Sequence, residues 1–184
     1  MDSSLRTFLI LAAVVSFASF IVAGWLYSWV KSRHSSNKRI AEVGKLITAG
    51  ANTFLKKEYI MLAKFAGVAA VLILIFLPRP IWLGDPLENV MMALAYVAGA
   101  VFSAAAGKIG IQIATIANMK TAEAAKEGIQ PSFMAGFRGG AVMGMAVVGS
   151  SLLGVTLVYV LTGSHSSLLG FSFGASSLAL FAKA

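Results

Sequence analysis

The chain has 184 residues, of which 58% are hydrophobic and only 12% are charged, with a net charge of +8 and no cysteine. About a quarter of the residues in a soluble domain are charged, so this composition excludes an ordinary soluble domain and indicates a polytopic membrane protein. The absence of cysteine excludes disulfides and thiolate metal ligands. The positive charge does not indicate nucleic-acid binding, because no basic stretch alternates with aromatic residues as in a strand-binding groove.

The apolar segments predict about five transmembrane helices, since roughly 20 apolar residues cross the hydrocarbon core of a bilayer. The first segment is uncharged and ends in Trp25, Tyr27 and Trp29, which are typical of a membrane interface. It is too long for the apolar region of a signal peptide, so we expect it to remain as an anchor. Pro78 and Pro80 mark the end of the second helix. The expected spans are residues 7–30, 60–82, 89–107, 139–163 and 166–184, within one transmembrane domain that covers residues 1–184.

Basic residues are distributed unequally between the two sides of this arrangement. The long connections after the first and third spans carry twelve lysines and arginines, whereas the other side carries only Arg6 and Arg79. Because basic loops resist translocation, we expect the N-terminus outside and both long connections in the cytoplasm. Apolar residues near helical spacing also predict that much of the first connection is helical. The twelve residues are Lys31, Arg33, Lys38, Arg39, Lys45, Lys56, Lys57, Lys64, Lys108, Lys120, Lys126 and Arg138.

Two rows of small residues at four-residue spacing predict close helix packing, which in lipid depends on contact between backbones. The alternative is that glycine and alanine are simply common in membrane helices, but two separate rows favour tight packing. The fifth span is also rich in small residues, so we expect it to lie inside the helix bundle. The rows are Ala95, Gly99, Ser103 and Gly107, and Gly136, Gly140 and Gly144.

The residues themselves indicate little chemistry. No Asp or Glu lies within the five spans, and Lys183 is the one candidate for an ionisable group at membrane depth, and so for ion transport. Glu123 and Glu127 stand four residues apart, a spacing more typical of a solvated helix face than of a metal site. No Walker-type phosphate loop, catalytic triad or carboxylate cluster can be assembled. We therefore expect no catalytic, substrate-binding or metal-ligating residue in this chain.

Four segments in chain order resemble the beginning of the membrane-bound, ion-pumping pyrophosphatases. Each segment alone is weak evidence for the resemblance. All four together are specific to this family, because they occur in its order and on the sides of the membrane that the charges predict. The resemblance implies an N-terminal fragment that ends within the fifth helix, before the segments that bind pyrophosphate and Mg²⁺ in the family. The segments are ITAGANTFLKKEY (47–59), GKIGIQIATIANMKTAEAA (107–125), GFRGGAVMGM (136–145) and GFSFGASSLALFAKA (170–184).

The resemblance implies that the whole protein couples hydrolysis of inorganic pyrophosphate to outward transport of H⁺ or Na⁺. It also implies Mg²⁺ as cofactor, with ligands outside this chain, K⁺ as a second candidate cofactor, a homodimer, and the inner (plasma) membrane of a bacterial cell. The isolated fragment is expected to be inactive. The alternative is a small non-enzymatic membrane subunit or transporter fragment that acts through helix packing.

The resemblance further implies a role for Lys183. The family usually has arginine at this position, on a helix that lines the path between the hydrolytic pocket and the ion gate. Lysine retains the charge but lacks the planar guanidinium that binds two partners at once. The alternative is that Lys183 extends to the membrane interface, as lysines near helix ends do.

Overall fold

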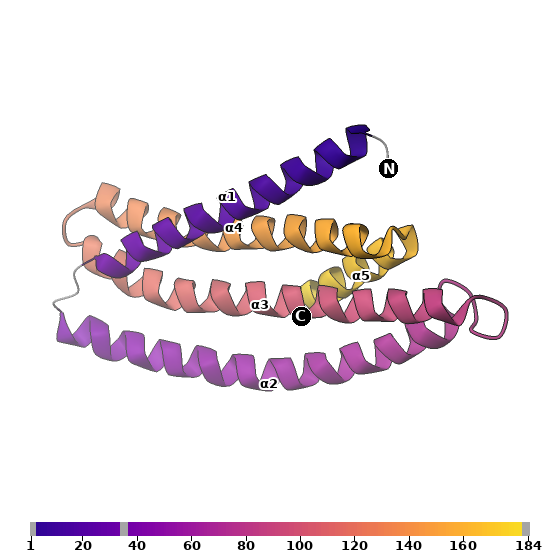
Figure 1. Ribbon diagram of the computed structural model, residues 1–184. Helices are drawn as coiled ribbons and strands as arrows, with labels where there is room; N and C mark the ends of the chain where they lie inside the picture. Colours follow the sequence, from indigo (N-terminus) through magenta and orange to yellow (C-terminus); the bar gives the residue numbers. More distant parts are fainter. Residues whose placement is uncertain (1–2, 34–36, 182–184) are drawn as a thin grey trace. The chain divides into compact units, whose positions relative to one another are not determined.

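The structure, a computed structural model, describes residues 3–33 and 37–181, and within these ranges the chain is all-α, with no strand (Figure 1). Four of its helices are long and apolar enough to cross a membrane. The predicted fold class, a helical polytopic membrane bundle, is therefore confirmed. The helices are α1 (Ser3–Ser32), α2 (Lys38–Phe76), α3 (Pro86–Ala124), α4 (Ile129–Thr162) and α5 (His165–Phe181).

Helices α2 and α3 are each 39 residues long, about twice the length that the hydrocarbon core requires. At 1.5 Å per residue each extends for about 58 Å. Helix α2 therefore includes most of the first basic connection from Lys38 onward, as its apolar spacing predicts. It ends at Phe76, two residues before Pro78, because proline cannot continue the hydrogen-bond ladder.

Local capping groups fix where the helices begin and end. The Oδ1 atom of Asn37 accepts hydrogen bonds from the backbone N–H groups of Arg39 (3.0 Å) and Ile40 (3.3 Å), which makes Asn37 the N-cap of α2. Helix α4 ends before Gly163, whose φ of 59° suits glycine. The N–H of Gly163 donates to the carbonyl oxygen of Tyr159 (2.8 Å) and so satisfies an end group of the helix.

The chain divides into two compact units, and α1 to α4 each contribute to both. Unit 1 comprises Met1–Ser16, Lys57–Ala105 and Ser150–Ala184, and unit 2 comprises Phe17–Lys56 and Ala106–Gly149. Each unit has buried apolar clusters of its own.

The core of unit 1 lies where α2 packs against the first half of α3. Small alanine side chains surround the buried residues, so the two helices approach closely over several turns. The buried residues are Ile73, Met92, Ala93 and Tyr96 in one cluster, and Leu62 and Ala100 in another.

The core of unit 2 joins the second half of α1 to α3 and α4. Leu26 and Val30 of α1 pack with Ile113 and Ala117 of α3 and with Val142 of α4. Val30 is fully buried at the end of the first predicted span, so α1 is anchored where its apolar segment ends.

Much of the exposed surface is apolar, as a lipid-facing surface requires. Exposed fractions reach 73% for Ile21, 75% for Met61 and 78% for Leu161. Helix α5 is described over 17 residues and also exposes large apolar side chains on one face. The fold and its surface together therefore suit a bilayer.

Candidate functional site

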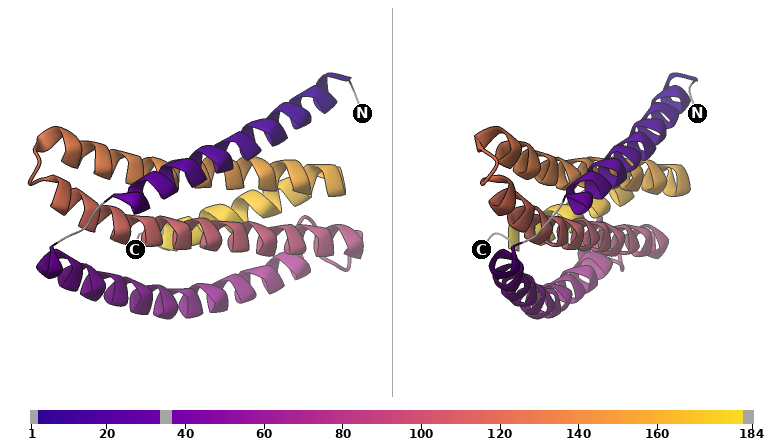
Figure 2. Two further views of the ribbon diagram at one scale, coloured as in Figure 1. Left: turned by 60° about the vertical axis from the view of Figure 1, so that its left-hand side comes forward. Right: turned by 90° about the vertical axis from the view of Figure 1, so that its left-hand side faces the viewer.

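Helix α5 lies directly against the first half of α3, as both views in Figure 2 show. Gly170 and Gly174, one helical turn apart on α5, face the backbone carbonyl oxygens of Met92 and Tyr96 on α3. A Cβ on either glycine would collide with the oxygen that it faces. The two backbones are therefore in contact, and only glycine fits at these two positions of α5.

Gly99 makes the matching contact from α3, since a Cβ there would collide with the carbonyl oxygen of Phe171. The Phe171 side chain is 3% exposed, and its ring fills the space in front of Gly154 on α4. The same ring meets Phe102 edge-on, with centroids 5.8 Å apart. Gly154 on α4 and Phe102 on α3 thus both border the Phe171 ring. We call the contacts of Gly99, Gly170 and Gly174 the α3–α5 seam.

Polar contacts extend the seam in both directions. The buried Ser177 hydroxyl donates to the carbonyl oxygen of Gly174 (3.1 Å), so the Tyr96 hydroxyl, 3.2 Å away, is the donor to Ser177. At the start of α5, the Ser166 hydroxyl donates to the Glu88 carboxylate (2.7 Å). These bonds fix the register of α5 along α3.

Helix α3 is itself tied to α2. The side-chain amide of Asn89, which is 1% exposed, donates to the carbonyl oxygens of Leu74 (3.1 Å) and Arg79 (2.7 Å). Further along the same pair of helices, the Tyr59 hydroxyl donates to the carbonyl oxygen of Ala104 (2.6 Å). Helix α5 is therefore seated on a fixed pair of helices.

The first predicted row of small residues follows α3. Ala95 and Gly99 are buried, and Ser103 and Gly107 are partly buried. Gly99 belongs to the seam, where its lack of a side chain is required. The role of the row as a whole in helix packing stays a prediction.

The second predicted row lies on α4 within unit 2. A Cβ on Gly136 would lie 3.4 Å from Oγ1 of Thr121, an ordinary contact distance. A Cβ on Gly140 or Gly144 would have nothing within 4 Å. These two glycines are therefore open to whatever surrounds the chain, and their packing role also stays a prediction.

Gly170 and Gly174 were missing from the predicted rows, although they lie in a span expected to be buried. Their four-residue spacing is the signal that could have identified them. Within α5 the buried face is narrow, since Leu169 and Phe173 are 65% and 53% exposed.

The predicted transport residue, Lys183, lies outside the described residues. Glu123 is not simply solvated, because its Oε1 accepts a hydrogen bond from the backbone N–H of Asn37 (3.0 Å), whereas Glu127 is exposed. Within residues 3–33 and 37–181, no group of three or more His, Asp or Glu side chains could hold a metal ion. We therefore assign no metal ligand in this part of the chain.

These features define a polytopic helical membrane protein whose fifth helix is fixed against its third by glycine contacts. The chain belongs to the inorganic H⁺ pyrophosphatase family, which it matches over residues 17–184.

Named relatives include both proton and sodium pumps. The chain is 36% identical over 173 residues to a K⁺-insensitive pyrophosphate-energized proton pump of Methanosarcina mazei, covering 94% of this chain and 24% of the relative. It is 35% identical over 180 residues to a putative K⁺-stimulated pyrophosphate-energized sodium pump of Clostridium tetani, covering 97% and 25%. A K⁺-stimulated sodium pump of Thermotoga maritima is 36% identical over 139 residues, covering 74% and 18%. The chain thus spans about a quarter of the length of the first two relatives.

Proposed function

We propose that this chain is the N-terminal membrane portion of a pump that couples hydrolysis of inorganic pyrophosphate to outward transport of H⁺ or Na⁺. The observation that carries the proposal is the family match over residues 17–184, together with relatives named as pyrophosphate-energized pumps. These names favour the pump over a non-enzymatic subunit that acts through helix packing alone.

In this proposal the described residues supply a scaffold rather than reacting groups. The α3–α5 seam sets the position and register of α5, and the chain beyond the seam leads to Lys183. Hydrolysis of pyrophosphate needs charge neutralisation, which Mg²⁺ supplies. Following the family resemblance, we place the Mg²⁺ ligands in parts of the complete protein outside this chain.

Several finer points of the proposal come from the family resemblance. Lys183 would couple hydrolysis to ion movement, as a charge that pairs with an acidic group on another helix. The complete protein would be a homodimer in the inner membrane of a bacterial cell. K⁺ is a candidate second cofactor, because relatives are named as either K⁺-insensitive or K⁺-stimulated.

A hydrolysis assay tests the proposal. The complete protein, in which this chain is followed by the rest of the family's length, should release phosphate from pyrophosphate in detergent when Mg²⁺ is present. The 184-residue chain, purified in the same way, should release none above background. The proposal fails if the complete protein is inactive on pyrophosphate. Turnover by the chain alone would instead show that the hydrolytic site lies within it.

A further inference from the structure

Two guanidinium groups lie on one indole ring in unit 2. The Cζ atom of Arg138, on α4, is 3.8 Å from the centroid of Trp29, and the Cζ atom of Arg33, just after α1, is 4.3 Å from it. Both distances are within the range of cation–π contacts. The two Cζ atoms are therefore no more than about 8 Å apart. We call Trp29, Arg33 and Arg138 the arginine–tryptophan cluster.

The cluster is held in place by its surroundings. Trp29 packs against the buried core of unit 2. The Lys120 ammonium donates to the backbone carbonyl oxygen of Arg33 (2.5 Å), which fixes the chain as it leaves α1. A fourth cation, Lys31, lies 5.9 Å from the ring centroid of Tyr27. The site is thus preorganised and strongly positive.

The two arginines of the cluster have no carboxylate paired with them among residues 3–33 and 37–181. Two like charges near one ring repel each other, and an anion that contacts both guanidinium groups would reduce that cost. The planar, forked guanidinium groups match the oxygens of a phosphate group in particular.

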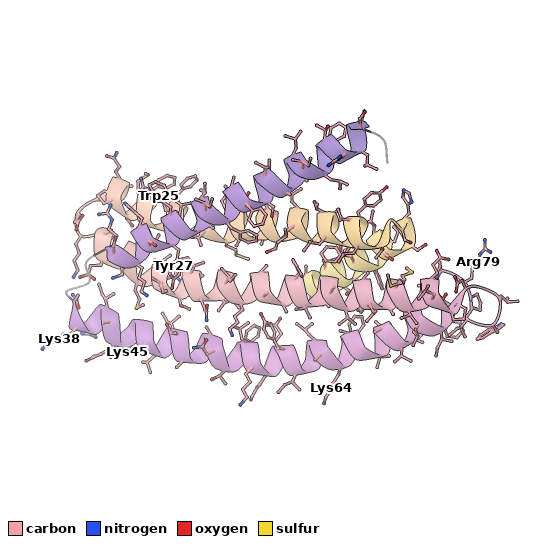
Figure 3. The ribbon with its side chains drawn as sticks, in the orientation of Figure 1. Trp25, Tyr27, Lys38, Lys45, Lys64 and Arg79 are labelled. Atoms are coloured by element: carbon pink, nitrogen blue, oxygen red, sulfur yellow. The ribbon has the colours of Figure 1, made fainter. Side chains whose placement is uncertain are left out.

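The position of the cluster in sequence places it at a membrane surface. Arg33 follows the end of the first predicted span by three residues, and Arg138 directly precedes the start of the fourth. One turn before Trp29, the Trp25 side chain is 62% exposed, as expected for a ring at the level of lipid headgroups (Figure 3). The charge distribution assigns this side to the cytoplasm, where anionic lipids concentrate.

We propose that the arginine–tryptophan cluster binds the phosphate of an anionic phospholipid headgroup. The acyl chains of that lipid lie along the exposed apolar face of α1, which includes Val22 and Trp25. This apolar continuation favours a lipid over a free phosphate ion, which would gain nothing from it. The site is independent of pyrophosphate hydrolysis and does not require it.

Quenching of tryptophan fluorescence by brominated lipids tests the proposal. In a Trp82→Phe background, the remaining indoles, Trp25 and Trp29, both lie near this end of α1. The 184-residue chain is reconstituted in phosphatidylcholine vesicles with increasing fractions of brominated phosphatidylglycerol, and in parallel with brominated phosphatidylcholine. We expect a preference for phosphatidylglycerol. Arg138→Gln should lower this preference about fivefold, which corresponds to ~1 kcal/mol for one basic side chain at a membrane surface.

A matched variant separates the cluster from net charge. The double variant Lys38→Gln/Lys45→Gln removes two charges from the first turns of α2, where both lysines are exposed (Figure 3). It should change the lipid preference less than twofold, whereas Arg33→Gln/Arg138→Gln should abolish it. If both double variants lose the same share of the lipid preference, that preference depends on net charge alone, and the proposal is wrong.

A phosphate competition and a lysine double variant complete the test. Millimolar inorganic phosphate should leave the lipid preference unchanged, and complete displacement by phosphate would assign the site to a free anion instead. If circular dichroism shows that the glutamine variants do not fold, Arg33→Lys/Arg138→Lys takes their place. This variant retains the charge but loses the guanidinium fork, so it should lower the preference more than twofold. An unchanged preference in a folded lysine variant would contradict the proposal.

Discussion

The contact between α5 and α3 leaves no room for a side chain at Gly174. Its Cα lies so close to α3 that a methyl group would collide with the Tyr96 carbonyl oxygen, a backbone atom that cannot move alone. Elsewhere in a helix, replacing glycine by alanine adds about 1 kcal/mol of stability through helix propensity. At the seam the collision outweighs that gain, because overpacking costs about 1–3 kcal/mol or more.

A pair of glycine variants tests this balance. Gly174→Ala should lower the unfolding free energy of the chain in detergent by up to about 2 kcal/mol, the overpacking cost less the gain in helix propensity. Gly144→Ala, with open space around its Cβ, should leave it unchanged or raise it by up to ~1 kcal/mol. Denaturant unfolding followed by helix content measures both. Equal stability of the two variants would show that α5 does not touch α3 through Gly174.

The sequence alone could identify which small residues are able to pack, but not their partners. The spacing of Gly170 and Gly174 is visible in the printed sequence, whereas the carbonyl oxygens of Met92 and Tyr96 belong to another helix with no distinguishing residue type. For the same reason, nothing in the composition distinguishes Gly99, which the seam requires to be glycine, from Gly144, which is open.

At the scale of the elements, hydropathy predicted the number and order of the helices but not their lengths. It detects only the apolar part of a helix, and α2 and α3 continue well beyond it. A polar helix and a polar loop have similar hydropathy, so hydropathy does not show where a helix begins or ends. The helix ends depend instead on local groups such as Asn37 and Pro78. Hydropathy therefore underestimates the length of a helix that continues beyond its apolar segment.

The predicted topology of these helices is testable because the chain has no native cysteine. Leu83, between α2 and α3, is 73% exposed, and Glu127, between α3 and α4, is also exposed. An impermeant thiol reagent added to intact cells should label Leu83→Cys. It should label Glu127→Cys only after the membrane is permeabilised, since the basic connections are expected inside. The reverse labelling pattern would invert the topology.

In the whole molecule, Lys183 is the residue proposed to couple hydrolysis to ion transport, and that role comes from the family resemblance. In the complete protein, Lys183→Ala should impair ion transport more than pyrophosphate binding, because it removes a charge proposed to pair at membrane depth. Lys183→Arg should largely preserve transport, since it retains the charge. Both activities are measured in the same vesicles. Near-normal transport and hydrolysis in Lys183→Ala would mean that Lys183 only reaches toward the interface.

Ion uptake by inverted membrane vesicles tests whether this chain is part of a pump driven by pyrophosphate. With the complete protein present, Mg²⁺ and pyrophosphate added outside these vesicles reach the cytoplasmic face. We expect that either H⁺ or Na⁺ then accumulates inside, and that an ionophore for that ion abolishes the accumulation. Hydrolysis of pyrophosphate with no accumulation of either ion in sealed vesicles would contradict this expectation.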